Sequence, residues 1–280
     1  MANLIDCYHK SPYLSIKYDT YFPVYERLLT PYVGKKITLV EVGVFNGGSL
    51  FMWREFLGPQ ARIIGLDLNP DALEWRKHGF EIHIGDQGSE AFWDKFFAEV
   101  GPVDVLIDDG GHTNLQQVVT AHKSIAKIRD GGLLIVEDVH TSYFREFGNP
   151  SKYSFINFAF RIVDGINSRS FALRDTYRRY SSRVYSVNFF ESIVVFHIDS
   201  RLCTRSLPTS NGGESRDASD FRYQGAWQSY LFSLKNGLPV NGGWLRAPVL
   251  RGLRLGIDFA LSLLSRAKSF GCRQFFRKLD

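Results

Sequence analysis

The chain has 280 residues, of which 44% are hydrophobic and 22% are charged, and this composition excludes an intrinsically disordered protein. The formal net charge of +5 is concentrated near the C-terminus, because residues 240–280 hold eight Lys and Arg residues and two acidic ones. The remainder is close to neutral, whereas a nucleic-acid-binding domain normally carries a broad basic patch on its working surface. We therefore expect no nucleic-acid partner.

Cysteine usage and hydrophobic runs indicate the compartment. Cys7, Cys203 and Cys272 are far apart and form no C-x-x-C pair, so the sequence predicts neither a disulfide framework nor a zinc site. The first residues include polar and charged side chains where a secretory signal needs an uninterrupted apolar region. No apolar run approaches the roughly 18–20 residues that cross a bilayer. We expect a cytoplasmic protein.

Residues 1–36 are predicted to form an N-terminal helical flank or lid, rich in tyrosine. Tyr21, Val24, Tyr25 and Leu28 have the spacing of one helix face. From residue 37 to residue 200, short β-branched runs alternate with amphipathic stretches, which predicts a Rossmann-like α/β domain with a mostly parallel sheet and helices on both faces. Strands are expected at 37–42, 62–68, 80–84, 103–107 and 132–137, and helices at 49–57, 70–78, 90–100 and 114–128.

The last two strands of this domain, at residues 184–190 and 192–198, are too close together for a crossover helix between them. They are therefore expected to pair antiparallel, which places one antiparallel strand near the edge of the sheet. Dinucleotide-binding Rossmann sheets are typically all parallel, so the antiparallel strand distinguishes the predicted sheet from a dinucleotide-binding one.

Residues 201–280 are predicted to be a polar loop followed by a basic, amphipathic helical appendage. The helical spacing is carried by Leu250, Leu253, Ile257, Leu261 and Leu264. Two interpretations of this helix stay open. It can bind peripherally to an anionic membrane at its inner face, or it can pack on the body of the protein or on a second subunit of a homo-oligomer.

A glycine-containing loop follows the first strand. Gly43 and Gly47 allow the backbone to turn sharply and to approach a ligand at the carboxyl edge of the sheet. The spacing differs from the dinucleotide pattern G-x-G-x-x-G, and Glu41 would repel a pyrophosphate but suit a cationic ligand. A purely structural turn is the alternative.

Acidic residues end the next two strands. Asp67 is placed to accept hydrogen bonds from both hydroxyls of a ribose, and its alternative role is to cap the following helix. Asp86 and Gln87 can reach the edge of an adenine, or they form an ordinary turn. Together with Glu41 of the first strand, Asp67 and Asp86 make three acids at three successive strand ends. This set is hard to explain as turns and favours a nucleoside-containing ligand.

Two acidic pairs end the fourth and fifth strands. Asp108 and Asp109 open the run D-D-G-G-H, which ends in His112, and Glu137 and Asp138 open the run E-D-V-H. Carboxylates that converge from adjacent strands repel one another unless a cation lies between them. Oxygen ligands without cysteine favour Mg²⁺, or another divalent cation such as Mn²⁺ or Ca²⁺.

Five motifs between residues 37 and 145 together resemble a known family. They are E-V-G-V-x-x-G-G-S-L-x-M-W, G-L-D, G-D-Q, D-D-G-G-H and E-D-V-H-T-S-Y. As a set they resemble the macrocin-type sugar O-methyltransferases, which are metal-dependent class I methyltransferases related in fold to cephalosporin hydroxylase. This resemblance implies the class I methyltransferase fold, S-adenosylmethionine as methyl donor, and Mg²⁺.

The resemblance also implies roles for single residues. The metal would be held by Asp109, Glu137 and Asp138, and His112 would be the general base, with Asp109 also in the catalytic set. Glu41, Gly43, Asp67 and Gln87 would bind the methyl donor. To these cofactor-binding residues we add Gly47, Asp86 and Asp108, by their positions in the same loops.

The predicted activity is transfer of a methyl group to a hydroxyl of a sugar or of a glycan-containing acceptor. The metal lowers the pKa of that hydroxyl, and neutral His112 removes its proton. A non-sugar acceptor such as a catechol is the main alternative. A non-catalytic protein with this fold, or an NAD-dependent oxidoreductase, is a more distant one.

Overall fold

We describe a computed structural model of the chain, which covers residues 3–147, 151–170, 178–214, 226–238 and 247–277. The chain divides into two compact units, Met1–Thr209 and Ser210–Asp280, each described here on its own. The functional division expected at residues 36 and 200 stays a prediction.

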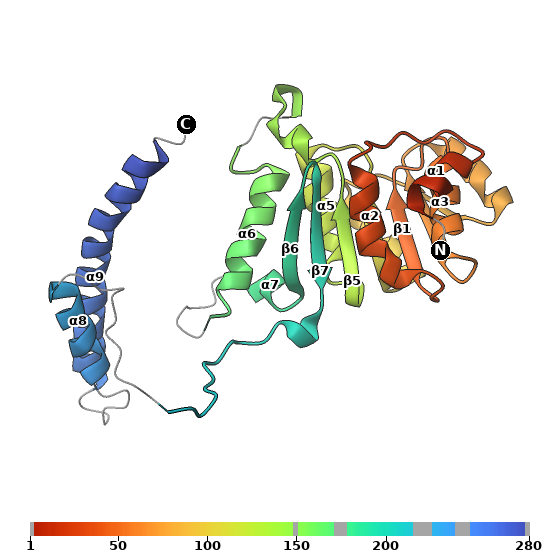
Figure 1. Cartoon of the computed structure of the whole chain (residues 1–280). Helices are drawn as coiled ribbons and strands as arrows, with labels where there is room; N and C mark the ends of the chain where they lie inside the picture. The colour runs from red at the N-terminus through yellow and green to blue at the C-terminus, as the bar shows by residue number, and fades with distance from the viewer. Residues whose placement is uncertain (1–2, 148–150, 171–177, 215–225, 239–246, 278–280) are drawn as a thin grey trace. The chain divides into compact units, whose positions relative to one another are not determined.

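The first unit contains a seven-stranded sheet in the order β3-β2-β1-β4-β5-β7-β6 (Figure 1). Strands β1 to β5 are parallel, and β7 lies antiparallel between β5 and β6. The predicted parallel sheet with one antiparallel strand near its edge is confirmed. The strands are β1 Thr38–Val42, β2 Arg62–Asp67, β3 Glu81–Ile84, β4 Val103–Asp108, β5 Ile128–Val136, β6 Val184–Phe190 and β7 Ile193–Ile198.

Helices cover both faces of this sheet. The α-helices of the first unit are α1 Leu4–Lys10, α2 Tyr21–Leu29, α3 Gly48–Leu57, α4 Glu90–Val100, α5 Asn114–Ser124, α6 Phe155–Asn167 and α7 Arg178–Ser181. The 3₁₀ helices are η1 Thr30–Tyr32, η2 Pro70–His78, η3 Val139–Tyr143, η4 Arg145–Phe147 and η5 Ser200–Leu202. Helices α4 and α5 begin where Ser89 and Thr113 accept backbone N–H groups, as capping residues do.

One predicted pair of boundaries is wrong. A helix was expected over 114–128 and a strand over 132–137, but α5 ends at Ser124 and β5 already begins at Ile128. The N–H of Lys127 donates to the carbonyl of Ser124, and the Lys127 carbonyl accepts from Val103. The chain therefore turns into the sheet as soon as β4 offers a backbone partner, which helix periodicity does not reveal.

Two hydrophobic clusters fill the space between the sheet and its helices. Side chains alternate along a strand, so Leu39 of β1 belongs to one cluster and its neighbour Val40 to the other. Trp53 and Tyr25 are fully buried in the first cluster, and Trp93 is fully buried in the second. Because both faces are covered, polar side chains of the sheet meet ligands at its carboxyl edge.

The N-terminal flank packs on the first of these clusters. The side chains of Leu4 and Cys7 on α1 are buried in it. Between α1 and α2 the chain runs without helix or strand, and Ser11 Oγ donates to the carbonyl of Gly48 at 2.8 Å. This connection brings residues 11–14 against the N-terminus of α3.

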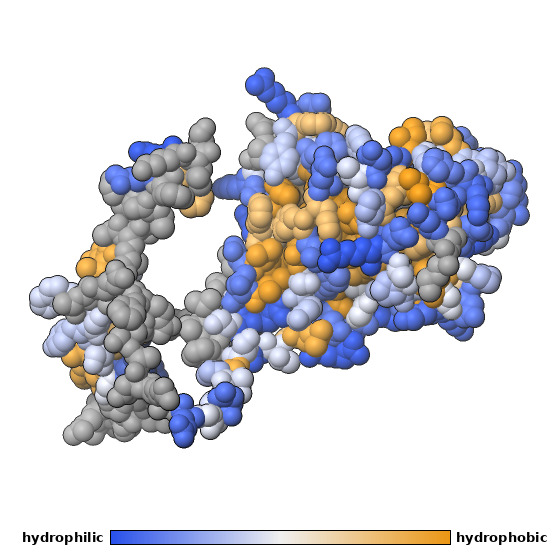
Figure 2. Space-filling model, in the orientation of Figure 1, coloured by the Kyte–Doolittle hydropathy of each residue, from blue (hydrophilic) through white to orange (hydrophobic). Residues whose placement is uncertain are grey.

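In the described part of the second unit the chain forms the helices α8 Ala226–Gly237 and α9 Ala247–Phe276. Helix α9 extends beyond both ends of the helical spacing predicted from Leu250 to Leu264, and α8 was not predicted. Lys235 Nζ lies 2.6 Å from Asp258 Oδ1 and links the two helices. Apolar side chains of this unit reach its surface, among them Leu255 and Phe259 (Figure 2). Within the described residues, no helix is both long enough and apolar enough to span a membrane.

Candidate active site

A cavity of about 800 Å³ opens at the carboxyl ends of the parallel strands, a volume typical of small-molecule sites. It is lined by residues that follow five successive strand ends and by part of the N-terminal connection. These are residues 42–46, 66–69, 85–87 and 109–112, Asp138, and Leu14, Ser15 and Ile16, with further residues from α3, η2, α4 and α5.

The glycine loop after β1 forms one wall of this cavity. Gly43 has a φ of 87°, and a Cβ there would lie 2.0 Å from the carbonyl oxygen of Asp109. Gly47 has a φ of 75°, and a Cβ there would lie 2.5 Å from the ring of Trp75. Both positions therefore require glycine for conformation and for space. The predicted sharp turn is present. The close contacts of both glycines are with Asp109 and Trp75 of the protein itself, and close approach to a ligand stays a prediction.

Asp67 holds this loop from the end of β2. Its Oδ2 accepts the backbone N–H groups of Val44 at 2.8 Å and of Phe45 at 3.2 Å, and its Oδ1 accepts that of Asn69. Asp86 lines the cavity after β3 and accepts the N–H of Gly88. Both acids lie where a nucleoside would be expected in an open α/β sheet.

Gln87 and Asp108 form a buried pair that supports the floor of the cavity. Nε2 of Gln87 donates to Oδ1 of Asp108 at 2.8 Å, and Oε1 of Gln87 accepts the N–H of Gly111. Burial raises the pKa of Asp108 to about 6, against the lowering effect of its hydrogen bonds with Gln87 and Gly110. Gln87 faces the cavity, whereas Asp108 lies behind it and fixes Gln87.

Glu41 is fully buried beneath the glycine loop and is not part of the cavity lining. Its oxygens accept hydrogen bonds from Ser49 Oγ at 2.6 Å and from Trp53 Nε1 at 2.9 Å. The nearest cation is Lys17, whose Nζ lies 3.7 Å from Oε1 of Glu41. Burial raises the pKa of Glu41, and Lys17 opposes that effect. The cationic partner that the sequence predicts for Glu41 is therefore supplied here by the protein itself.

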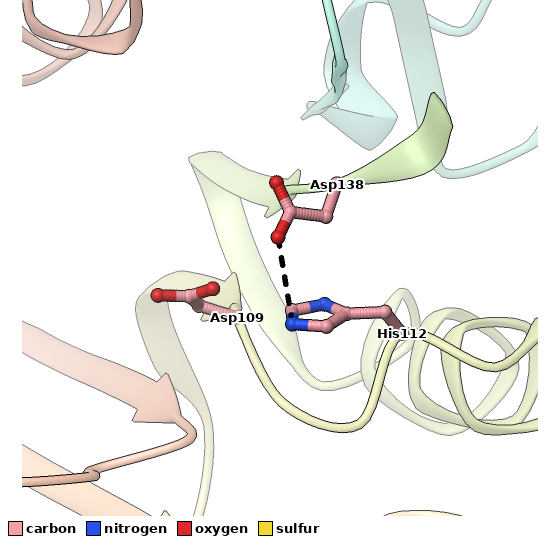
Figure 3. Close-up of side chains that lie close together, drawn as sticks. All are labelled: Asp109, His112 and Asp138. Carbon is pink, nitrogen blue, oxygen red and sulfur yellow. Dashed lines mark ion pairs between the residues drawn. The ribbon is translucent and has the colours of Figure 1, made fainter. Parts of the chain in front are cut away.

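Asp109, His112 and Asp138 all line the cavity, at its rim, and their side chains lie close together (Figure 3). One potential ligand atom from each lies within 4.8 Å of the others, and His112 Nε2 is 3.5 Å from Asp138 Oδ2. The Nδ1 atom of His112 is buried without a hydrogen-bond partner among the described residues. Two carboxylates and an imidazole form a donor set that fits a divalent cation such as Mg²⁺ or Mn²⁺.

Glu137, the third metal ligand implied by the resemblance, lies outside this group. Its Oε1 lies 2.7 Å from Lys17 Nζ and also accepts the hydroxyl of Tyr25. Asp138 stays at the rim, where the Tyr21 hydroxyl donates to its Oδ1 at 2.5 Å. The structure thus turns the two neighbouring carboxylates toward different partners.

The N-terminal flank contributes three polar groups that the sequence analysis did not assign: Lys17, Tyr21 and Tyr25. Burial alone would lower the pKa of Lys17, but Asp109, Glu137 and Glu41 raise it well above its ordinary value. The spacing of the two tyrosines predicted a helix face without indicating that their hydroxyls meet carboxylates. Lys17 lies outside any regular element and belongs to no motif, so no local signal identifies it.

The charges of this region do not balance. Three carboxylates, those of Glu41, Asp109 and Glu137, lie within 4 Å of the ammonium group of Lys17. A fourth carboxylate, that of Asp138, lies beside His112 and accepts from the Tyr21 hydroxyl. Burial raises the pKa of Glu137, and Lys17 counteracts this. Two of these carboxylates, Asp109 and Asp138, line the cavity, where they favour the binding of a further cation.

The sheet order, with an antiparallel strand inserted near the edge of a parallel sheet, and the glycine loop at its ligand-binding edge define the Rossmann-like class I methyltransferase fold. Solved structures agree. The MycE methyltransferase from the mycinamycin biosynthetic pathway, in complex with Mg and SAH, superimposes with a TM-score of 0.64 at 22% identity, over 71% of this chain and 55% of that chain. Its complex with Mg, SAH and mycinamycin VI gives 0.63 at 23% identity, over 71% and 54%.

Curated sequences confirm the resemblance to macrocin-type O-methyltransferases. The mycinamicin VI 2''-O-methyltransferase of Micromonospora griseorubida is 32% identical over an alignment of 172 residues, and the match covers 54% of this chain and 42% of the relative. The demethylmacrocin O-methyltransferase of Streptomyces fradiae is 31% identical over an alignment of 151 residues, and the match covers 50% of this chain and 38% of the relative. The matches therefore span less than half the length of these relatives. No family model matches the chain.

Proposed function

We propose that this protein transfers a methyl group from S-adenosylmethionine to a hydroxyl of a sugar or a glycan-containing acceptor, with the help of a divalent cation, preferably Mg²⁺. The observation that carries the proposal is the position of Asp109, His112 and Asp138 at the rim of the cavity that the glycine loop and Asp67 enclose. The names of the similar proteins, which are O-methyltransferases, support it.

The methyl donor would occupy the cavity between the glycine loop and the ends of β2 and β3. Gly43 lines the cavity and would allow close approach of the donor, whereas Gly47 would act by holding the turn of the loop against Trp75. Asp67 would bind the ribose hydroxyls. Asp86 and Gln87 would contact the adenine from the end of β3. Glu41 and Asp108 would act from behind the cavity wall, by holding the loop residues that touch the donor.

The divalent cation would be held by Asp109 and Asp138, next to His112. When bound, such a cation lowers the pKa of a hydroxyl and fixes its orientation.

His112 is the proposed general base. Its Nε2 lies next to Asp138, whose carboxylate favours the imidazolium that forms when the acceptor hydroxyl gives up its proton. The freed oxygen lone pair then attacks the methyl carbon of the donor, and the bond from that carbon to sulfur breaks. Because the reacting charges neutralise each other, orientation and exclusion of water are expected to dominate the rate.

A methyl-transfer screen tests the proposal. The chain is incubated with S-adenosylmethionine labelled in the methyl group and with glycosides, free sugars or catechols, with and without EDTA. We expect labelled glycoside, loss of turnover in EDTA, and recovery with excess Mg²⁺. Full turnover in EDTA would contradict the role of the metal, and turnover of catechols alone would favour the non-sugar acceptor.

The second unit is proposed to mediate association, through the exposed apolar side chains of α9 and its basic residues. Leu255 and Phe259 are 64% and 65% exposed and lie one helical turn apart. Either an anionic membrane surface or a second copy of the chain fits such a helix. Flotation with anionic vesicles and sedimentation of the full chain, compared with a chain ending at residue 245, distinguish the two.

We place the activity in the cytoplasm, since Cys7 and Cys203 are free thiols.

A further inference from the structure

Lys17 is the buried cation of the acidic centre. Its side chain is 1% exposed, and its Nζ lies 2.6 Å from Asp109 Oδ2 and 2.7 Å from Glu137 Oε1. The rings of Tyr25 and Trp53 lie 5.9 and 6.0 Å from the same atom. An ammonium group in such surroundings is stable only if carboxylates compensate for the water it has lost. The position of Lys17 is therefore set by charge.

The carboxylate of Glu137 is engaged by Lys17 and by a second donor. Its Oε1 accepts from both Lys17 and Tyr25, and the residue is 1% exposed. Asp109 differs, because its side chain is 21% exposed and it meets His112 and Asp138 at the cavity rim. Asp109 thus stands between an inner group, with Lys17 and Glu137, and an outer group that faces the cavity.

We propose that Lys17 is a positioning residue that occupies Glu137 and orients Asp109, so that the divalent cation is held by Asp109 and Asp138 without Glu137. The metal part of this inference rests on the proposed function. Lys17 then compensates the charge of the buried carboxylates permanently. Asp109 and Asp138 form the site at which the divalent cation binds and dissociates.

The same lysine fixes a wall of the cavity. Leu14, Ser15 and Ile16 line the cavity directly before Lys17 in the chain. This stretch lies against α3, where a Cβ on Gly48 would come within 2.4 Å of the Tyr13 carbonyl. Holding Lys17 among the carboxylates therefore also holds the segment that closes the donor cavity.

A double-mutant cycle tests the pairing of Lys17 with Glu137. Removing one partner of a buried ion pair leaves the other charge uncompensated, whereas neutralising both avoids that penalty. We expect Lys17→Met to lower the midpoint of thermal unfolding by roughly 5–10 °C. The double variant Lys17→Met with Glu137→Gln should recover a clear part of this loss. Lys123→Met is the matched control, because Lys123 also pairs with two acids, Glu90 and Asp94, but away from the cavity.

Mn²⁺ titration, followed by electron paramagnetic resonance, tests the metal part without requiring turnover. Asp138→Asn should weaken Mn²⁺ binding by at least about tenfold, and Glu137→Gln should change it by less than about threefold. Lys17→Met should tighten binding by about tenfold, because Glu137 becomes free to act as a third carboxylate ligand. In the double variant this gain should disappear.

Two results would overturn the inference. One is a loss of Mn²⁺ binding in Glu137→Gln as large as in Asp138→Asn, and the other is strictly additive unfolding effects in the cycle. If Lys17→Met does not fold, the Glu137→Gln titration and the double variant still decide. Wild-type protein that binds Mn²⁺ as expected but transfers no methyl group would contradict the proposed function alone. Wild-type protein without Mn²⁺ binding would contradict both.

Discussion

Nε2 of His112 lies 3.5 Å from Oδ2 of Asp138, although the two residues follow different strands of the sheet. Both have left-handed backbone conformations, with φ of 57° for His112 and 55° for Asp138. Such a conformation costs a non-glycine residue about 1–3 kcal/mol and persists where the surroundings hold it. Here the Thr141 Oγ1 lies 2.9 and 2.8 Å from the carbonyl oxygens of His112 and Asp138, so that its single O–H is shared between them. The imidazole and the carboxylate are thus brought together by the backbone.

His112→Asn tests the proposed base. Asparagine tolerates the left-handed conformation but cannot act as a base, so the fold should survive. We expect the rate of methyl transfer to fall by about 10²–10⁴-fold while the affinity for S-adenosylmethionine stays unchanged. The control is His140→Gln, at a histidine whose Nδ1 lies 2.7 Å from Ser192 Oγ. An equal loss of rate in both variants would argue against a special role of His112.

Gly43 needs glycine for two reasons, its positive φ and the lack of space for a Cβ, and a comparison of Gly43→Ala with Gly34→Ala separates them. Both glycines have positive φ, 87° and 72°, but a Cβ at Gly34 meets nothing within 4 Å. Gly34→Ala should therefore cost only the conformational term, about 1–2 kcal/mol. Gly43→Ala should cost about 1–3 kcal/mol more, because its Cβ collides with the Asp109 backbone, and it should abolish donor binding. Urea unfolding and calorimetric titration with S-adenosylmethionine measure both effects. Equal losses of unfolding free energy in the two variants would show that the Asp109 backbone moves aside for the Cβ without a measurable penalty.

Asp67→Asn should weaken the binding of S-adenosylmethionine by more than about tenfold. The carboxylate accepts three backbone N–H groups, and an amide cannot accept on both sides, so the loop loses at least one hydrogen bond. A loss of about 1–3 kcal/mol in unfolding free energy should accompany the weaker binding. Asp71→Asn, at another acid that lines the cavity, is the control. Unchanged affinity in Asp67→Asn would remove the assignment of Asp67 to the donor.

His197 on β7 predicts a dependence of stability on pH. Burial lowers the pKa of His197 below its ordinary value of 6.5. Below that pH the unfolded chain therefore binds a proton more readily than the folded one, and the free energy of unfolding falls as the pH falls through this window. His197→Gln should show a smaller loss of stability between pH 7.5 and pH 5.5. His9→Gln, at an exposed position on α1, should keep the wild-type slope. A slope equally reduced in both variants would contradict this origin.

Several features followed from the sequence, because they depend on short stretches of the chain. Hydrophobic periodicity predicted a strand at each of the positions where β1 to β7 lie. The short connection between β6 and β7 predicted that these two strands pair antiparallel. The acids and glycines at the strand ends could be assigned to one edge, since parallel strands bring their carboxyl ends together. Helix α6 was missed, although Ser154 caps it and its apolar residues have helical spacing.

What the sequence determined by itself is the sheet and the side chains gathered at its carboxyl edge, because strand direction and hydrophobic pattern are local properties. Only the tertiary structure decided how the charges are partnered there. Lys17 lies 92 residues from Asp109 and 120 from Glu137 in the chain, within a connection that has no regular structure. The orientation of Glu137 away from Asp138 depends on that lysine, on Tyr25 and on the left-handed turn at Asp138. Buried charges are compensated in space, whatever their distance along the chain.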